Sequence, residues 1–210
     1  VYTSLMLRAV HTGSLLAEAL DVPRDGHAGG LDLPAADQPI AYALFAHCFS
    51  CSKDYKGVVR VSRALADKGI AVLRFDFTGL GESEGDFADT TFSSNVSDLV
   101  AAAEFMAGEF EAPKILIGHS LGGAVAAILG IYMMDDGMNV DRVITFGQPK
   151  FTNVAGARAY QRLPLMRVMN QNDVVALWPD SFDKQQQPFA HIGPLVNVLP
   201  GPHYSFIPAG

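Results

Sequence analysis

The stretch that decides the fold is KILIGHSLGG (114–123), which joins an apolar run to a long Ala- and Gly-rich segment. Residues 114–117 have the apolar character of a buried strand. Residues 121–134 are apolar nearly throughout, as in a helix packed against a sheet. Ser120 therefore lies between two glycines in a tight strand-to-helix turn. Such a turn exposes the serine hydroxyl, which makes Ser120 a candidate nucleophile.

Glycine-rich turns have two other interpretations. A turn of this kind can be purely structural, with the serine capping the helix. The strand before Ser120, the helix after it and the additional Gly123 favour the nucleophile instead. Dinucleotide binding would need G-x-G-x-x-G, and neither this turn nor the loop 79–85 matches it.

Outward from this turn, strand-like runs alternate with amphipathic stretches, a pattern typical of a mostly parallel sheet covered by helices on both faces. An opening hairpin is expected over 5–20, and a loop over 25–39. No internal repeat or linker interrupts the pattern, so one domain over 1–210 is expected. The predicted strands are 41–46, 70–75, 114–117, 142–146, 166–169 and 196–199, and the predicted helices are 58–68, 94–110, 121–134 and 154–161.

The composition excludes several classes of partner. The formal net charge of -7 argues against nucleic acid, which requires basic patches, and weakly against anionic membranes. No apolar run approaches the roughly 20 residues of a membrane span, so stable membrane insertion is not expected. The first ten residues lack the basic-then-apolar order of a signal peptide, which favours a cytoplasmic location. The oligomeric state cannot be predicted from these features.

The only cysteines, Cys48 and Cys51, form a C-x-x-C pair. A thioredoxin-like redox pair usually opens a helix, whereas this pair follows a predicted strand. A zinc site would need two further ligands. We therefore expect two free cysteines that fill space as small hydrophobic groups, and neither a metal nor a cofactor. Whether the two sulfurs lie close enough for a disulfide is left open.

A serine nucleophile needs a base and an acid that orients it, and in strand-turn-helix sites of this kind the order is Ser, Asp or Glu, then His. Asp173 follows the strand 166–169, and His203 follows the strand 196–199, so these two are the predicted acid and base. The competitors all lie between those two strands, and they are Asp180, Asp183 and His191.

The oxyanion that develops during acyl transfer needs two preorganised N–H donors. The first is expected to be the N–H of Leu121, directly after the nucleophile. The second is expected from the loop after the strand 41–46, with the Phe49 N–H favoured and Cys48 as the alternative. His47 is expected to brace this loop and not to act as a second base.

Two resemblances to known families rest on these motifs. The first half resembles α/β-hydrolase modules that bacteria fuse to an osmotic-stress (OsmC-like), peroxide-handling domain, on the stretches FAHCFSCSKD (45–54), GIAVLRFDFTGLGESEGDF (69–87), FSSNVSDLVAAAEF (92–105) and IGHSLGGA (117–124). The second half resembles class 3 (fungal-type) triacylglycerol lipases, on VITFGQPKFTN (143–153), LMRVMNQNDVVALWP (165–179) and FAHIGPLVNVLPGPHYS (189–205).

Both resemblances imply a single-domain α/β-hydrolase fold with little or no cap domain. The lipase resemblance also implies that Asp173 and His203 complete a triad with Ser120, and that His191, in an H-x-G segment, is not catalytic. The first half lacks the oxyanion loop and lid of those lipases, and the 210 residues include no stretch that resembles an osmotic-stress domain. These departures from the lipase pattern favour esterase activity over true lipase activity.

The sequence thus predicts a serine carboxylesterase that forms an acyl-enzyme on small-molecule esters with short to medium acyl chains. Class 3-type lipase and thioesterase activities use the same triad and are the alternatives. A catalytically silent binding protein is the non-enzyme alternative, because fold does not fix function. The chain-length expectation depends on the segment 78–95, which carries too few large apolar residues to form an amphipathic lid.

Overall fold

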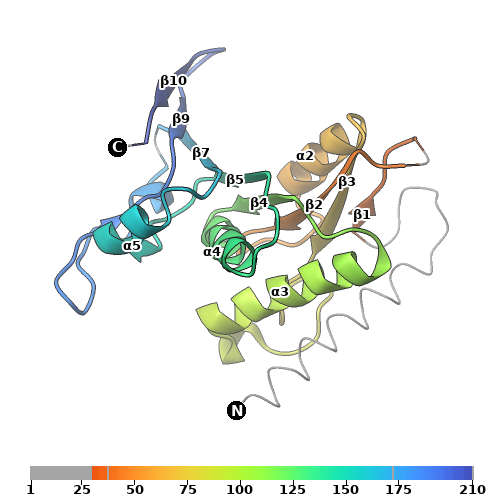
Figure 1. The fold of residues 1–210 in the computed structure, drawn as a ribbon, viewed down its shortest axis with the longest axis horizontal. Helices are drawn as coiled ribbons and strands as arrows, with labels where there is room; N and C mark the ends of the chain where they lie inside the picture. Colours follow the sequence, from red (N-terminus) through yellow and green to blue (C-terminus); the bar gives the residue numbers. More distant parts are fainter. Residues whose placement is uncertain (1–29, 37, 172, 210) are drawn as a thin grey trace.

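The computed structural model describes residues 30–36, 38–171 and 173–209, and the predicted hairpin over 5–20 lies outside them. The described chain forms one eight-stranded sheet in the order β1-β3-β2-β4-β5-β7-β9-β10, with parallel pairing between β3 and β9 and antiparallel pairing at both edges (Figure 1). The predicted mostly parallel sheet is confirmed. Its strands are β1 (Leu31–Asp32), β2 (Ala41–Ala46), β3 (Ile70–Phe75), β4 (Ile115–His119), β5 (Arg142–Phe146), β7 (Leu165–Asn170), β9 (Leu195–Val198) and β10 (Tyr204–Ile207).

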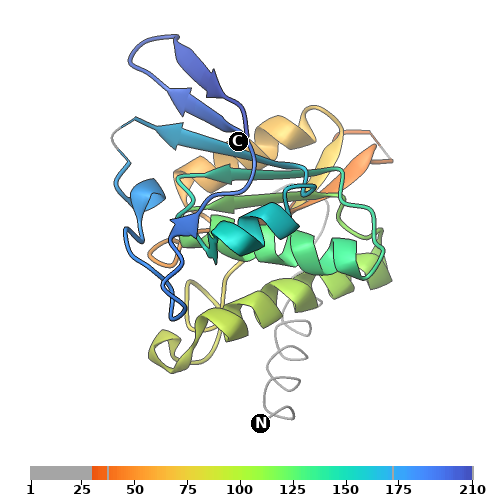
Figure 2. The same cartoon turned by 60° about the vertical axis from the view of Figure 1, so that its left-hand side comes forward.

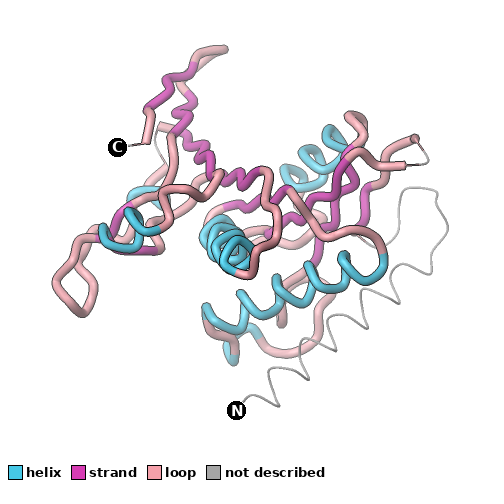
Figure 3. The backbone as a smooth tube through the Cα atoms, viewed as in Figure 1, coloured by secondary structure: helices cyan, strands magenta, loops and turns pink. Residues whose placement is uncertain are grey.

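Helices cover both faces of this sheet, as the alternating pattern predicted. One face carries α3 and α4, which pack on each other, and the opposite face carries α2 (Figures 1 and 3). The α-helices are α2 (Lys56–Ala66), α3 (Phe92–Glu109), α4 (Leu121–Asp135) and α5 (Val154–Ala159), with short 3-10 turns η1 (Phe87–Asp89) and η2 (Val175–Leu177). A second, two-stranded sheet pairs β6 (Thr152–Asn153) with β8 (Phe189–Ala190).

The strand β2 shows why the central runs are apolar without alternation. Its Leu44 and Ala46 face the larger core under α3 and α4, whereas Ala43 and Phe45 face the smaller core under α2. Successive strand residues point to opposite faces, and both faces of a parallel sheet are buried. Buried Leu or Phe side chains contribute about 1.5–3 kcal/mol each, so the strand is held from both sides.

Four short strands differ from the sequence-based expectation. Residues 31–32, predicted to be loop, form β1 against β3, where the buried Arg74 Nε donates to Asp32 Oδ2 at 2.7 Å. The residues after β9 form the antiparallel partner β10, and the small β6–β8 sheet was also not predicted. Each is two to four residues long and depends on distant partners, so its local sequence carries little periodic signal.

No helix in the described part of the chain is long and apolar enough to cross a membrane.

Candidate active site

The turn at Ser120 has the strained geometry that its sequence predicted. Ser120 follows β4, has a φ of 56° and directly precedes the first residue of α4. A Cβ at Gly118 would lie 2.4 Å from the Gly123 Cα, and one at Gly122 would lie 2.2 Å from the His47 carbonyl oxygen. Glycine is therefore required at both positions that flank the serine. The Ser120 N–H donates to the Phe146 carbonyl at 2.7 Å, which ties the turn to β5.

In the variant Gly122→Ala we expect the free energy of unfolding to fall by about 3 kcal/mol, as in severe overpacking. The added methyl group would collide with the backbone carbonyls of Ala46 and His47. The matched control is Gly108→Ala on α3, where an added Cβ has nothing within 4 Å and helix propensity favours alanine by up to about 1 kcal/mol. Urea unfolding of both variants is the measurement, and equal stabilities would contradict this account of the turn.

Asp173 reaches the same edge of the sheet as Ser120. The carboxyl ends of parallel strands lie together, and Asp173 comes three residues after β7, two strands from β4. Its carboxylate packs against Gly147, where a Cβ would lie 2.2 Å from Asp173 Oδ2 and where φ is +60°. The Val175 N–H donates to Asp173 Oδ1 at 3.0 Å. Two strand spacings of about 4.8 Å leave room for one imidazole between the serine and the carboxylate.

In the described part of the chain, the His203 side chain makes no hydrogen bond or ion pair with Ser120 or Asp173. It is exposed in the turn between β9 and β10, where its carbonyl accepts from the Leu199 N–H at 3.0 Å. In the sheet, β9 is three strands from β4, which at about 4.8 Å per strand separates the two by about 14 Å. A base must come within about 2.6–3.2 Å of the hydroxyl whose proton it removes. Figure 2 shows the β9–β10 hairpin extending at the outer edge of the sheet.

Two of the three residues that competed for the triad, His191 and Asp183, have partners of their own. His191 Nε2 lies 2.8 Å from the Ala176 carbonyl, and burial together with the positive charge of Arg167 lowers the pKa of His191 to about 4. The carboxylate of Asp183 accepts from the Asn153 amide and from two backbone N–H groups, which lowers its pKa. Asp180 is exposed.

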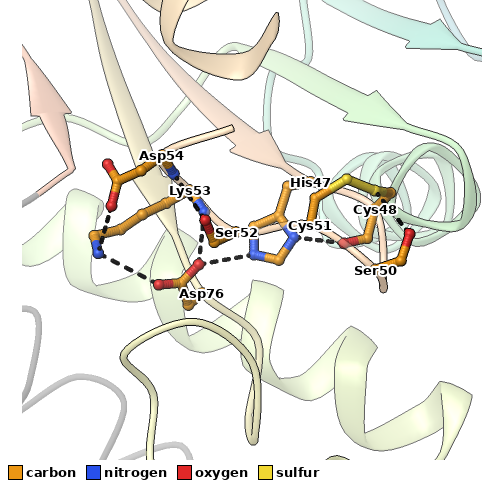
Figure 4. Close-up of a disulfide and its surroundings, with 8 residues drawn as sticks. All are labelled: His47, Cys48, Ser50, Cys51, Ser52, Lys53, Asp54 and Asp76. Carbon is orange, nitrogen blue, oxygen red and sulfur yellow. Dashed lines mark hydrogen bonds and ion pairs between the residues drawn. A yellow bond between two sulfur atoms is a disulfide. The ribbon is translucent and has the colours of Figure 1, made fainter. Parts of the chain in front are cut away.

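The loop after β2, which we name the oxyanion loop (residues 47–53), is held by His47 and Asp76. The buried His47 ring places Nδ1 2.7 Å from the Cys48 carbonyl and Nε2 3.1 Å from Asp76 Oδ1 (Figure 4). The expectation that His47 braces this loop is thereby confirmed.

Asp76 is the anchor of this arrangement, a role that the sequence did not reveal. Burial alone would raise the pKa of Asp76, but contacts from His47, the N–H groups of Lys53 and Glu82, and the Lys53 ammonium group outweigh burial and lower the pKa to about 2. The Lys53 N–H lies 2.6 Å from Asp76 Oδ1, and the Glu82 N–H lies 3.1 Å from Oδ2. Asp76 therefore stays charged and joins the oxyanion loop to the loop after β3.

The sequence favoured two free cysteines and left a disulfide open, and in the structure Cys48 and Cys51 form a disulfide within the oxyanion loop (Figure 4). The Cys51 N–H donates to the Cys48 carbonyl at 3.1 Å, and this turn sets the two Cα atoms 5.2 Å apart, within the range for a disulfide. A C-x-x-C spacing does not distinguish such a turn from a helix.

The two expected oxyanion donors lie on neighbouring strand ends. Leu121 is the first residue of α4, so its N–H has no acceptor within the helix. Phe49 stands three residues after β2, and its ring packs edge-on against Phe77 and Phe87 with centroids 5.4 Å away in each case. The close approach of Gly122 to the His47 carbonyl places the oxyanion loop directly against the start of α4.

One further histidine, His119, was not considered from the sequence. It ends β4 beside the nucleophile, and its ring stacks on Tyr55 with centroids 6.4 Å apart. Burial lowers the pKa of His119, an effect that the negative charge of Asp173 partly offsets. Its position directly before Ser120 and its interaction with Asp173 make it the rival to His203 as the base.

The fold and this site define a hydrolase of the α/β class. The model of the alpha/beta hydrolase family matches residues 43–209, so the chain belongs to that family. This chain is 36% identical to a solved structure titled the esterase domain of a Rhodothermus marinus protein. The match covers 70% of each chain, with a TM-score of 0.51. Protein XC6422 of Xanthomonas campestris, titled a serine hydrolase without lid, shares the fold at 23% identity, with 81% of this chain and 76% of that one covered and a TM-score of 0.57.

Curated relatives match a shorter part of the chain. A mitochondrial palmitoyl-protein thioesterase of Mus musculus, ABHD10, is 33% identical over 92 residues, which is 38% of this chain and 30% of that protein. Lipase ZK262.3 of Caenorhabditis elegans is 39% identical over 67 residues, which is 30% of this chain and 19% of that protein. The chain thus spans less than a third of the length of either relative. The resemblances to OsmC-fused modules and to class 3 lipases remain predictions.

Proposed function

We propose that the protein hydrolyses carboxylic esters through an acyl-enzyme on Ser120. The observation that carries this proposal is the turn itself, in which a serine with positive φ stands between β4 and α4. The flanking Gly118 and Gly122 are packed so closely that neither has room for a Cβ. Such strain persists where function requires a side chain to project from the chain. The relatives that are an esterase, a thioesterase and a lipase by name support the same reaction class.

The proposed reaction assigns one step to each predicted residue. The Ser120 hydroxyl attacks the ester carbonyl while His203 takes its proton, and the N–H groups of Leu121 and Phe49 stabilise the oxyanion. The imidazolium then protonates the departing alcohol, and water releases the acid by the same path. Asp173 holds the imidazole in the required tautomer. Because β9 is three strands from β4, this assignment requires His203 to reach Ser120 across the ends of β5 and β7.

Thioesterase activity is the second candidate, and the similarity to the palmitoyl-protein thioesterase favours it. A thioester presents the same kind of carbonyl to Ser120, and its leaving group departs as a thiol. The same nucleophile and oxyanion donors therefore serve both reactions, so the two candidates differ in the leaving group alone.

Labelling with a fluorophosphonate tests whether Ser120 is activated. We expect the wild-type chain to be labelled at Ser120, because this probe reacts with serines whose hydroxyl a base has activated. Mass spectrometry of the labelled peptide gives the site, and Ser120→Ala is the control. A wild-type chain that stays unlabelled, or that is labelled equally in Ser120→Ala, would favour the catalytically silent binding protein.

We expect a preference for short acyl chains and no activation at an oil–water interface. Residues 78–91 form a loop with only the three-residue turn η1 and the exposed charges of Glu82 and Glu84, so no amphipathic helix is present there to act as a lid. The measurement is kcat/KM for p-nitrophenyl esters from acetate to palmitate, below and above their solubility limits. A maximum at long chains with a jump in rate on emulsion formation would contradict this expectation.

A further inference from the structure

A second cluster of reactive side chains lies beside the Ser120 turn. The sulfurs of Cys48 and Cys51 and a ring nitrogen of His119 all lie within 4.8 Å of one another. The cysteines come from the oxyanion loop after β2, and the histidine ends β4, which pairs directly with β2. The ester hydrolysis proposed above, with His203 as the base, gives none of these three side chains a chemical step.

The ring of His119 carries an unsatisfied group. Its Nδ1 is buried and has no hydrogen-bond partner in the described part of the chain. A buried polar atom without a partner costs about 1–3 kcal/mol, and such atoms call for an explanation. The stacking on Tyr55, with an interplanar angle of 14°, fixes the plane of the ring. An imidazole ring that is held in place and has a nitrogen without a hydrogen-bond partner is suited to coordinate a metal ion.

We propose that, after reduction of the disulfide, Cys48, Cys51 and His119 bind a zinc ion. C-x-x-C is the spacing of the two-cysteine half of zinc sites, and thiolates with imidazole are ligands that Zn²⁺ favours. Tetrahedral bonds of about 2.3 Å place two sulfurs about 3.8 Å apart. Breaking the S–S bond lets the sulfurs separate to that distance while the Cα atoms remain near 5.2 Å. Three protein ligands leave the fourth position to water.

The chemistry of this site has two steps. A dithiol reductant donates two electrons and two protons to the disulfide, so that the S–S bond breaks, two S–H bonds form and the reductant leaves as its own disulfide. Zn²⁺ then displaces the two thiol protons to solvent and forms two Zn–S bonds and one Zn–N bond. The metal changes no oxidation state.

Metal titration of the full chain tests this proposal without any measurement of activity. The chain is reduced with a dithiol, separated from it without air, and titrated first with Co²⁺ and then with Zn²⁺. We expect thiolate-to-cobalt charge-transfer bands together with the intense visible absorption of a tetrahedral site. One equivalent of Zn²⁺ should then remove both, with a Kd tighter than about 1 μM, equivalent to about -8 kcal/mol. The oxidised wild-type chain is the matched control and should give no charge-transfer bands.

Two variants assign the ligands. We expect His119→Gln and Cys51→Ser each to weaken Zn²⁺ binding by more than about 100-fold, since changes even outside the ligand shell cost about 10- to 100-fold. His119→Gln keeps the disulfide-forming pair, and Cys51 is only partly buried, so circular dichroism serves as the check that both variants fold. If either variant fails to fold, the comparison of reduced with oxidised wild type decides alone. Equal binding by the two wild-type forms, or full-affinity binding by folded His119→Gln, would overturn the proposal.

Discussion

Ser120→Ala is expected to lower kcat by about a million-fold while leaving the fold intact, as loss of the nucleophile does in a serine protease. Ser120 stands at the turn between β4 and α4, where its side chain is only partly buried, so its removal deletes the attacking oxygen and little packing. Alanine has the same Cβ as serine, so the strained φ of 56° costs the variant no more than the wild type. The measurement is hydrolysis of p-nitrophenyl acetate, with urea unfolding of both proteins.

The control for this prediction is Ser83→Ala. The Ser83 hydroxyl donates to the Asp76 carbonyl at 2.6 Å in the loop after β3, so this change removes a serine hydroxyl from the same part of the molecule without touching the turn. We expect a stability loss of about 1 kcal/mol and nearly unchanged kcat. A folded Ser120→Ala protein that keeps more than about a tenth of wild-type activity would end the assignment of the nucleophile.

The central strands and the turn at Ser120 were predictable because their signals are local. Strands buried on both faces read as unbroken apolar runs, and β2, β3 and β5 begin and end where the sequence placed them. Gly118 packs against Gly123 and Gly122 packs against the distant His47 carbonyl, yet both glycines belong to one short motif around Ser120. A local pattern of this kind needs no knowledge of distant partners.

The features that were missed depend on contacts between distant residues. The strand β1 is two residues long and is held by Asp32 and Arg74, which are 42 positions apart. The brace between His47 and Asp76 and the approach of His119 to the cysteines likewise join separate segments. The position of His203 was predicted in order along the chain, but the extra strand β10 holds it in a hairpin turn. Order along the chain therefore located the strand end that His203 follows, and the role of its side chain stays a prediction.

Asp173→Asn is expected to lower kcat by about ten thousand-fold, as in a serine protease whose orienting acid is replaced. The amide keeps the shape of the carboxylate, which fits tightly against Gly147, so packing is conserved while the negative charge that holds the imidazole is lost. The matched control is Asp180→Asn, an exposed residue past the same strand, for which we expect less than about twofold change, since exposed charges contribute little. The measurement is kcat for p-nitrophenyl acetate, and a larger loss in Asp180→Asn would show that the acid is misassigned.

The same assay decides which histidine serves as the base. His203→Ala should cost about as much as loss of the nucleophile, because base and nucleophile act as a unit. The double variant His203→Ala with Asp173→Asn should then be no slower than His203→Ala alone, since Asp173 has no imidazole left to orient. His119→Gln is the comparison, because His119 lies beside Ser120 in the chain and interacts with Asp173. If His119→Gln lowers kcat more than His203→Ala does, the base is His119, and the hairpin at the sheet edge has no part in the reaction.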